Sequence, residues 1–222
     1  FMGAPVAIVL ALGIALLVDL PLRGREIHRA IVFLPYPLMT VAIGIVWRWL
    51  YDEKVGLFNF VLQGSGATER GIAFLDSFEF SLVSIIVTYV WQIVGFFMVI
   101  ILTGLQTIPA ELHEAAEIDG AGPLRRFFAI TLPLLRSTFF LCFIVGIIHS
   151  FTSFDLVYVM TGGGPGHSSE ILVTYIYKAA FVLNRLDYGA ALTVVLFLLL
   201  LVITYGVNRL SGGDAGGTTY YE

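Results

Sequence analysis

Polar side chains that interrupt long apolar runs are the first candidates for chemistry in this sequence. The run over 82–105 contains an amide, Gln92, and two aromatic residues, Tyr89 and Phe96, at the spacing of one helical face. A second polar group crowds the end of the run over 134–154 and comprises His149, Ser150, Ser153 and Asp155. Polar groups within a membrane-spanning segment are costly to bury and frequently serve a function.

These two groups combine aromatic faces with amide, hydroxyl and carboxylate groups that form hydrogen bonds. Such a combination could hold a polar solute by stacking and hydrogen bonds, so we predict that these residues line a solute pathway. The alternative is structural. In that case Gln92 and the serines bond across neighbouring helices, and His149 is a packing residue.

The sequence shows no catalytic or metal-binding constellation. Its four histidines lie far apart and lack the spacing of metal ligands. The single cysteine, Cys142, lies in an apolar run and is expected to be a small buried hydrophobe. The glycine-rich segment 162–166 is not followed by the Lys-Ser/Thr pair of a phosphate loop. We therefore expect no active site, metal or cofactor in this chain.

The elements that carry these residues are predicted to be membrane-spanning helices. Hydrophobic residues make up 58% of the 222 residues and charged residues 13%, against roughly 25% charged in soluble domains. Mean hydropathy is +0.92. Five apolar runs are close to the roughly 20 residues that cross a bilayer. They cover residues 2–20, 30–50, 82–105, 134–154 and 188–207. We predict an all-α polytopic membrane protein with five transmembrane helices.

Polar segments connect the runs. Pro35 and Pro37 should kink the second run, because proline removes a backbone donor. The loops 51–77 and 155–187 are expected on the same side of the membrane, each with a short helix lying on its surface, over 57–62 and 173–181. We predict one transmembrane domain over 1–210, followed by a mobile Gly-rich tail over 211–222.

A markedly polar interruption between two strongly apolar runs covers residues 109–131. Its first half carries acids and small alanines at helical spacing, and the Asp119-Gly120 pair should end that helix, because glycine adopts a left-handed cap at little cost. Pro123 should then open a second short helix. Pro133 marks the start of the next apolar run.

This central loop resembles the EAA loop of bacterial ABC importer permeases. The residues that carry the resemblance are Glu114, Ala115, Ala116, Asp119, Gly120, Ala121 and Pro133. In that family the loop is a cytoplasmic coupling helix that docks into the ATP-binding subunit, so the resemblance implies this role for these seven residues. The alternative is a plain amphipathic connector. The segment 154–165 with Tyr175 and Tyr177 further resembles the carbohydrate-uptake, maltose-transporter-type subfamily.

The resemblance implies a permease subunit for a sugar or sugar-like solute that a solute-binding protein delivers. Its expected partners are a second, different permease chain and two ATP-binding subunits, which hold ATP and Mg²⁺. The lipid bilayer surrounds it, and the net charge of −4 suggests no nucleic-acid partner. A polyol or glycerol phosphate is the alternative solute. A stand-alone channel or an intramembrane enzyme is the alternative class.

Arginine and lysine residues predict the orientation in a bacterial or archaeal inner membrane. One side holds seven of them: Arg23, Arg25, Arg29, Arg125, Arg126, Arg136 and Arg209. The other side holds four: Lys54, Arg70, Lys178 and Arg185. The positive-inside rule therefore places loop 109–131 in the cytoplasm. Because the chain begins with Phe1 rather than Met, we expect a missing N-terminal span that completes a six-helix core.

Overall fold

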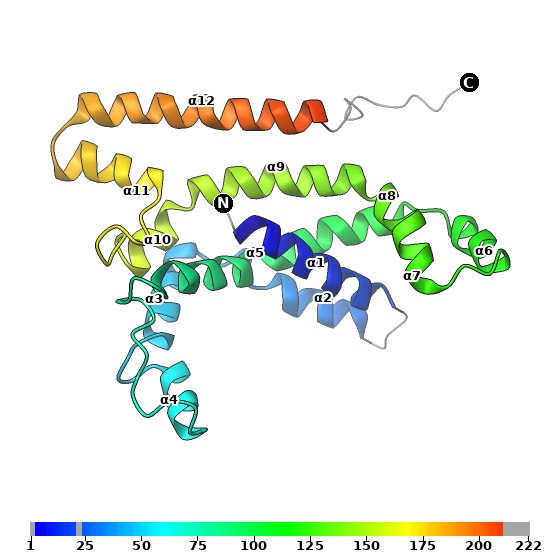
Figure 1. Ribbon diagram of the computed structural model, residues 1–222, viewed down its shortest axis with the longest axis horizontal. Coiled ribbons are helices and arrows are strands. Elements are labelled where there is room, and N and C mark those ends of the chain that lie inside the picture. The colour runs from blue at the N-terminus through cyan, green and yellow to red at the C-terminus, as the bar shows by residue number, and fades with distance from the viewer. Residues whose placement is uncertain (1–2, 21–23, 211–222) are drawn as a thin grey trace. The chain divides into compact units, whose positions relative to one another are not determined.

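The computed structural model describes residues 3–20 and 24–210, which form helices and no strand (Figure 1). This confirms the predicted all-helical fold class. The predictions that concern Arg23 and the tail over 211–222 lie outside the described residues. In chain order the helices are α1 (Gly3–Asp19), α2 (Arg25–Phe33), α3 (Thr40–Leu50), α4 (Leu57–Gly64), α5 (Ser81–Gln106), α6 (Ala110–Ile118), α7 (Pro123–Arg126), the π-helix η1 (Phe127–Thr131), α8 (Leu132–Leu134), α9 (Arg136–Thr152), α10 (Phe154–Met160), α11 (Leu172–Tyr177), the π-helix η2 (Lys178–Val182) and α12 (Leu186–Leu210).

Two described helices, α5 and α12, are long and apolar enough to cross a membrane. A third candidate is a bent pair that joins 123–134 to 136–151 at an angle of 62°. Helices α1 and α3 are apolar but have only 17 and 11 residues. Length and composition thus give two or three spans among the described residues, and the larger count of five stays a prediction.

The helix expected over 30–50 is broken and not merely kinked. Helix α2 ends at Phe33 and α3 begins at Thr40, with Pro35 and Pro37 between them. Two prolines in three residues leave two backbone positions without a donor, and they disfavour the helical conformation of the residues before them. The sequence predicted the place of this interruption, but the expected kinked helix is two separate helices.

The described chain divides into two compact units, and the first comprises Gly3, 37–92 and 148–199. Within it α3 packs closely on α10, where a Cβ at Gly44 would lie 3.0 Å from Val159. The loop 51–77 contains α4, close to the predicted helix over 57–62. Asn59 of α4 is buried, and its Nδ2 donates hydrogen bonds to the backbone oxygens of Asp52 (3.0 Å) and Ile72 (2.9 Å). This amide holds the loop folded on itself.

The second unit comprises 4–20, 24–36, 93–147 and 200–210 among the described residues. Its core relies on small residues that let helices approach closely. Four buried alanines form one stripe of α1, at positions Ala4, Ala7, Ala11 and Ala15. On α9 a Cβ at Gly146 would lie 2.9 Å from the Ala4 Cβ and 3.1 Å from the Phe97 ring.

Candidate functional site

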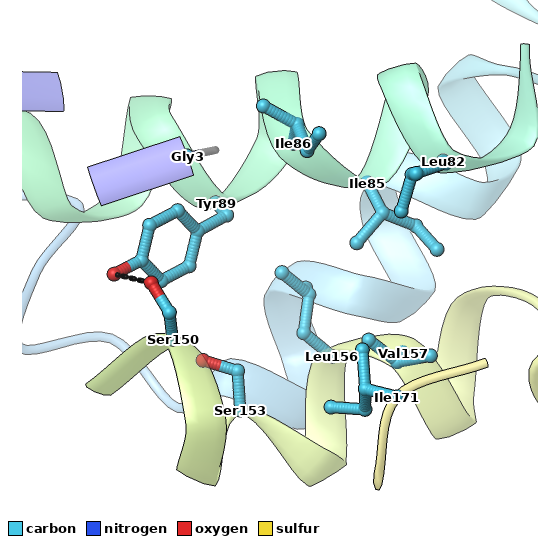
Figure 2. Close-up of a pocket in the computed structure, with 10 residues that line it drawn as sticks. All are labelled: Gly3, Leu82, Ile85, Ile86, Tyr89, Ser150, Ser153, Leu156, Val157 and Ile171. Atoms are coloured by element: carbon cyan, nitrogen blue, oxygen red, sulfur yellow. Dashed lines mark hydrogen bonds between the residues drawn. The ribbon is translucent and has the colours of Figure 1, made fainter. Parts of the chain in front are cut away.

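Part of the predicted solute pathway comes together in the first unit. Tyr89 of α5 is 6% exposed, and its hydroxyl accepts a hydrogen bond of 3.2 Å from the Ser150 Oγ of α9. The ring of His149 lies 5.8 Å from the Tyr89 ring, tilted by 51°. Gly3 lies against the other side of Tyr89, where a Cβ would come within 2.8 Å of the ring (Figure 2). The tyrosine is therefore held in one position.

A cavity of about 150 Å³ opens beside this pair. Figure 2 shows residues of α5 on one side and residues of α9 and α10 on the other. Tyr89, Ser150 and Ser153 supply its hydroxyl groups, and the remaining side chains are aliphatic. The Ser153 Oγ donates a hydrogen bond of 2.5 Å to the His149 backbone oxygen. Small-molecule sites usually enclose about 300–1,000 Å³, so the cavity in this conformation is smaller than a sugar requires.

The other predicted pathway residues do not line this cavity. Gln92 is buried and donates a hydrogen bond of 3.1 Å to the Thr40 Oγ1, which ties α5 to α3 as the structural alternative expected. Asp155 is exposed in the first turn of α10, where a carboxylate suits the helix dipole. Phe96 belongs to the second unit and stacks on Tyr36 with a centroid distance of 4.4 Å.

The central loop in the second unit folds as two short helices with a fixed turn. Helix α6 ends at Ile118, and Gly120 follows with φ 77°. The Ala121 N–H donates to the Ala116 carbonyl at 2.8 Å, and the Gly120 N–H donates to the Glu117 carbonyl at 3.0 Å. This pair of bonds is the Schellman motif that glycine completes. Pro123 is the first residue of α7, as predicted.

An ion pair that the sequence analysis did not identify locks the turn. Arg126 Nη1 of α7 lies 2.7 Å from Glu117 Oε2 of α6. Opposite charges nine residues apart, on either side of a glycine turn, are the signal that could have indicated it. Three motif residues, Ala116, Asp119 and Ala121, line a hollow of about 220 Å³ between the two helices. Three of the seven motif residues therefore share one hollow of the surface.

Beyond the turn, the chain changes direction sharply. The π-helix η1 follows α7, and α8 and α9 meet at Leu135 with the 62° bend. Pro133 lies in the short helix α8, two residues before this bend. A proline removes a backbone hydrogen bond, and π-turns accommodate the resulting irregularity.

The central loop exposes apolar side chains although it is polar overall. Ile118 is 88% exposed, Leu124 74% and Phe128 62%. Glu114 and Ala115 are also exposed, and α6 has no buried residue. A turn of fixed conformation that leaves large apolar side chains exposed is typical of a protein–protein contact.

A second fixed turn lies in the loop 155–187. Gly162 and Gly163 have φ 61° and 90°, so the glycine run forms a left-handed turn. The Glu170 carboxylate closes it, with one oxygen 2.6 Å from His167 Nδ1 and the other 2.5 Å from Lys178 Nζ. Burial acts to raise the pKa of Glu170, but the bonds from Lys178 and His167 outweigh it, and the pKa lies below its ordinary value. The sequence analysis did not identify this cluster.

Comparison with known sequences identifies relatives along nearly the whole chain. Residues 2–212 match the family described as "Binding-protein-dependent transport system inner membrane component". The sulfoquinovosyl glycerol transport system permease protein SmoG of Agrobacterium fabrum is 39% identical over 200 residues, which are 90% of this chain and 64% of SmoG. The trehalose/maltose transport system permease protein MalF of Thermococcus litoralis is 36% identical over 96% of this chain and 70% of MalF.

The sn-glycerol-3-phosphate transport system permease protein UgpA of Yersinia enterocolitica is 33% identical over 90% of this chain and 68% of UgpA. Among solved structures, a bacterial ABC transporter involved in the import of the acidic polysaccharide alginate contains a similar chain. The TM-score is 0.82 at 24% identity, over 94% of this chain and 72% of that chain. That likeness concerns the fold. The present chain spans slightly less than two thirds of the length of SmoG.

Proposed function

Since the chain belongs to the family of binding-protein-dependent transport system inner membrane components, we propose that it is a permease subunit of an ATP-driven importer. It is a transport subunit and not an enzyme. ATP and Mg²⁺ bind to separate ATP-binding subunits. The family match over residues 2–212 is the observation that carries this proposal.

Loop 109–131 is the proposed contact with an ATP-binding subunit. The Schellman turn at Gly120 and the Glu117–Arg126 ion pair fix α6 against α7, so the two helices move as one body. The exposed Ile118 and Leu124 then supply an apolar surface that a partner can cover. Motion of that partner on ATP binding would reach the membrane through η1, which ends the loop, and through α8 and α9, which follow it.

The proposed solute is a sugar or a sugar-like compound that an external solute-binding protein delivers. SmoG and MalF are named for transport of a glycosyl glycerol and of disaccharides, which supports this class. The Tyr89, His149, Ser150 and Ser153 cluster supplies one ring face and three hydroxyls. Because its cavity is small, a second permease chain, different from this one, is proposed to complete the pathway. UgpA makes glycerol phosphate the alternative solute.

Reconstitution in vesicles tests the proposed function. The permease pair with its ATP-binding subunits should accumulate the solute only when ATP and the solute-binding protein are both present. A stand-alone channel would carry the solute down its gradient without ATP. Failure of the chain to co-purify with an ATP-binding subunit, together with ATP-independent flux, would refute the importer assignment.

Substitutions in the cavity test the solute contacts. Tyr89→Phe and Ser150→Ala each remove a hydroxyl of the cavity. Loss of one hydrogen bond to the solute should raise the concentration for half-maximal uptake about fivefold to tenfold. Thr103→Val is the matched control, since the Thr103 Oγ1 bonds only its own helix at Val99. An unchanged half-maximal concentration in both variants would remove this cluster from the pathway.

A further inference from the structure

A polar cavity of about 650 Å³ lies in the first unit and shares no lining residue with the cavity at Tyr89. Its three walls are the end of α3 with the residues that follow it, residues 73–76, and the end of α10 with the start of the glycine turn. The volume falls within the 300–1,000 Å³ of small-molecule sites, which the Tyr89 cavity does not reach. Helix α10 borders both cavities, since Val157 lines the Tyr89 cavity and Tyr158 lines the polar one.

Hydrogen bonds hold the three walls in place. The Asn59 amide donates to the backbone oxygens of Asp52 (3.0 Å) and Ile72 (2.9 Å), and its oxygen accepts a bond of 2.8 Å from the Ile72 N–H. Asn59 is 1% exposed, so a buried side chain joins the first two walls. Arg48 Nη1 donates a bond of 3.5 Å to the Val159 carbonyl, which joins α3 to α10. The cavity is therefore preformed, as ligand sites usually are.

Charged side chains of both signs line the polar cavity. Three are carboxylates and two are cations: Asp52, Glu53, Asp76, Arg48 and Lys54. None of the ion pairs formed within the described residues involves any of these five side chains. Carboxylates accept hydrogen bonds, whereas lysine and arginine donate them, and a hydroxyl group does both. A ligand with several hydroxyl groups therefore matches this lining.

The excess of carboxylates disfavours an anionic ligand. The loops 51–77 and 155–187, which supply most of the walls, contain seven acidic and four basic residues, so the excess is not confined to the lining. Bringing like charges together at a binding site is unfavourable. A phosphate group would meet net negative charge in the polar cavity, whereas an uncharged sugar would not.

Aromatic rings supply flat surfaces against which a sugar ring can pack. Tyr158 lines the cavity and is 43% exposed. It stacks on Phe154 with a centroid distance of 5.0 Å, and the Tyr177 ring meets it edge-on at 5.2 Å. Tyr51 and Phe74 supply two further rings from the first two walls, with centroids 5.3 Å apart. Rings that are already fixed by their neighbours lose little freedom when a ligand binds.

We propose that the polar cavity is an entry site for one sugar unit of an uncharged solute. The sugar packs against Tyr158, its hydroxyls donate to the carboxylates, and Arg48 and Lys54 donate to its oxygens. This inference rests on the proposed function and deepens it, because it selects a neutral sugar over glycerol phosphate. Loops 51–77 and 155–187 are predicted on the side opposite loop 109–131, where a solute-binding protein would deliver the solute.

Protection of a thiol from chemical labelling tests the site without requiring transport. Ala73→Cys places a thiol in the cavity lining, in the Cys142→Ala background. The complete importer complex, in a detergent without a sugar headgroup, is labelled with N-ethylmaleimide in the presence of trehalose, maltose or diacetylchitobiose at millimolar concentrations. At least one of these neutral sugars should slow the labelling about tenfold, as expected when roughly nine-tenths of the sites are filled.

Glu69→Cys, at an exposed position of the same loop outside the lining, is the matched control. Its labelling rate should not change with any sugar. Glu53→Cys, also in the lining, is a second reporter if the complex with Ala73→Cys does not assemble.

The charge of the solute is tested with matched compounds. The sugar that protects is compared with its phosphorylated form, as trehalose is with trehalose 6-phosphate. The phosphate should raise the concentration for half-maximal protection about tenfold or more. Asp76→Lys replaces an acid of the lining with a base and should reduce this difference, whereas Glu69→Lys, outside the lining, should not.

Variants of Tyr158 test the aromatic surface. Tyr158→Ala removes the ring and should raise the concentration for half-maximal protection about fivefold. Tyr158→Phe keeps the ring and should leave that concentration within about twofold of the unchanged value. Equal effects of the two substitutions would remove Tyr158 from the site.

Several outcomes would overturn the proposal. Failure of all three neutral sugars to protect the thiol would remove the site, and equal protection by a sugar and its phosphate would remove the selection by charge. Protection by glycine betaine and by no sugar would show that the charges hold a zwitterion. With any of these results, ATP-driven uptake by the same complex would leave the importer assignment in place. Protection without ATP-driven uptake would instead remove that assignment and keep the sugar site.

Discussion

Gly120 closes α6 in a left-handed conformation, φ 77°, that residues with a Cβ adopt at a cost of about 1 kcal/mol or more. No heavy atom lies within 4 Å of where its Cβ would be, so the constraint is in the backbone and not in packing. The two hydrogen bonds of the turn depend on this conformation. Gly120 therefore fixes the angle between α6 and α7 without contributing any contact of its own.

Gly120→Asp should leave the chain inserted in the membrane but reduce ATP-driven uptake at least tenfold, because the loop loses its fixed angle. Gly122→Asp is the matched control. Gly122 also has open space around it, but its φ is −65°, and aspartate suits its position as the cap of α7. Uptake in vesicles, normalised to the amount of assembled complex, is the measurement. Equal uptake by the Gly120→Asp variant and the unchanged protein would contradict this role.

The stability of the loop 155–187 should depend on pH through Glu170. Its pKa is lowered from the ordinary value of 4.5, so the carboxylate stabilises the folded loop above that pH. This stabilisation is lost as the pH falls through the lowered pKa of the folded state. Thermal unfolding of the complex should therefore show a lower midpoint at pH 3.5 than at pH 7.

Glu170→Gln should lower the unfolding midpoint at pH 7 and make it less sensitive to pH below 5. The loss of a charged bond to Lys178 corresponds to about 1–2 kcal/mol. Glu69→Gln removes an exposed carboxylate in the loop 51–77 and should change neither quantity. Identical pH profiles for the Glu170→Gln variant and the unchanged protein would show that the cluster does not hold the turn.

At the scale of the helices, the sequence predicted those features that local residues determine. Asp119-Gly120 and Pro123 gave the boundaries of α6 and α7, because caps and prolines act within one turn. The 62° bend at Leu135 was not predicted, because Pro133, two residues earlier, was interpreted only as the start of an apolar run. The Gln92–Thr40 bond joins residues 52 positions apart, and periodicity alone carries no information on such a pair. The Glu170 cluster lies within one loop, where the chain has no helical periodicity that would bring its members together.

Close approach between helices makes a further prediction at this scale. A Cβ at Gly95 of α5 would overlap the backbone oxygen of Val32 on α2, and backbone atoms cannot move aside as a side chain can. Gly95→Ala should therefore destabilise the second unit by about 1–3 kcal/mol. Gly13→Ala on α1, where no atom lies within 4 Å, should be neutral or slightly stabilising.

The heat resistance of both alanine variants is measured as the fraction of complex that remains monodisperse after heating. We expect the Gly95→Ala variant to aggregate at a lower temperature than the unchanged protein, and the Gly13→Ala variant to aggregate at the same temperature or a higher one. Equal heat resistance of the two variants would mean that α2 and α5 do not approach as closely as described.

For the whole molecule, burial differs sharply between the two long spans. In the most apolar stretch of α5, 61% of the residues are buried within the chain, whereas the corresponding stretch of α12 has no buried residue. An apolar helix that the chain leaves uncovered is stable only in lipid or against other proteins. Both lipid and protein neighbours are expected for α12, since members of this family are inner-membrane components of transport systems.

We propose that loop 109–131 contacts an ATP-binding subunit, and single cysteines can test this contact. The sequence has one cysteine, Cys142, which is buried, so Cys142→Ala provides a background for single-cysteine variants. Ile118→Cys places a thiol at the most exposed apolar residue of the loop, and Glu69→Cys places one in the loop 51–77 for comparison.

Site-specific cross-linking of these variants in intact membranes tests the claim most directly. We predict that the Ile118→Cys variant forms a covalent product with an ATP-binding subunit and that the Glu69→Cys variant does not. A product between the Ile118→Cys variant and the external solute-binding protein, or labelling of that thiol from outside the cell, would show that loop 109–131 does not contact an ATP-binding subunit.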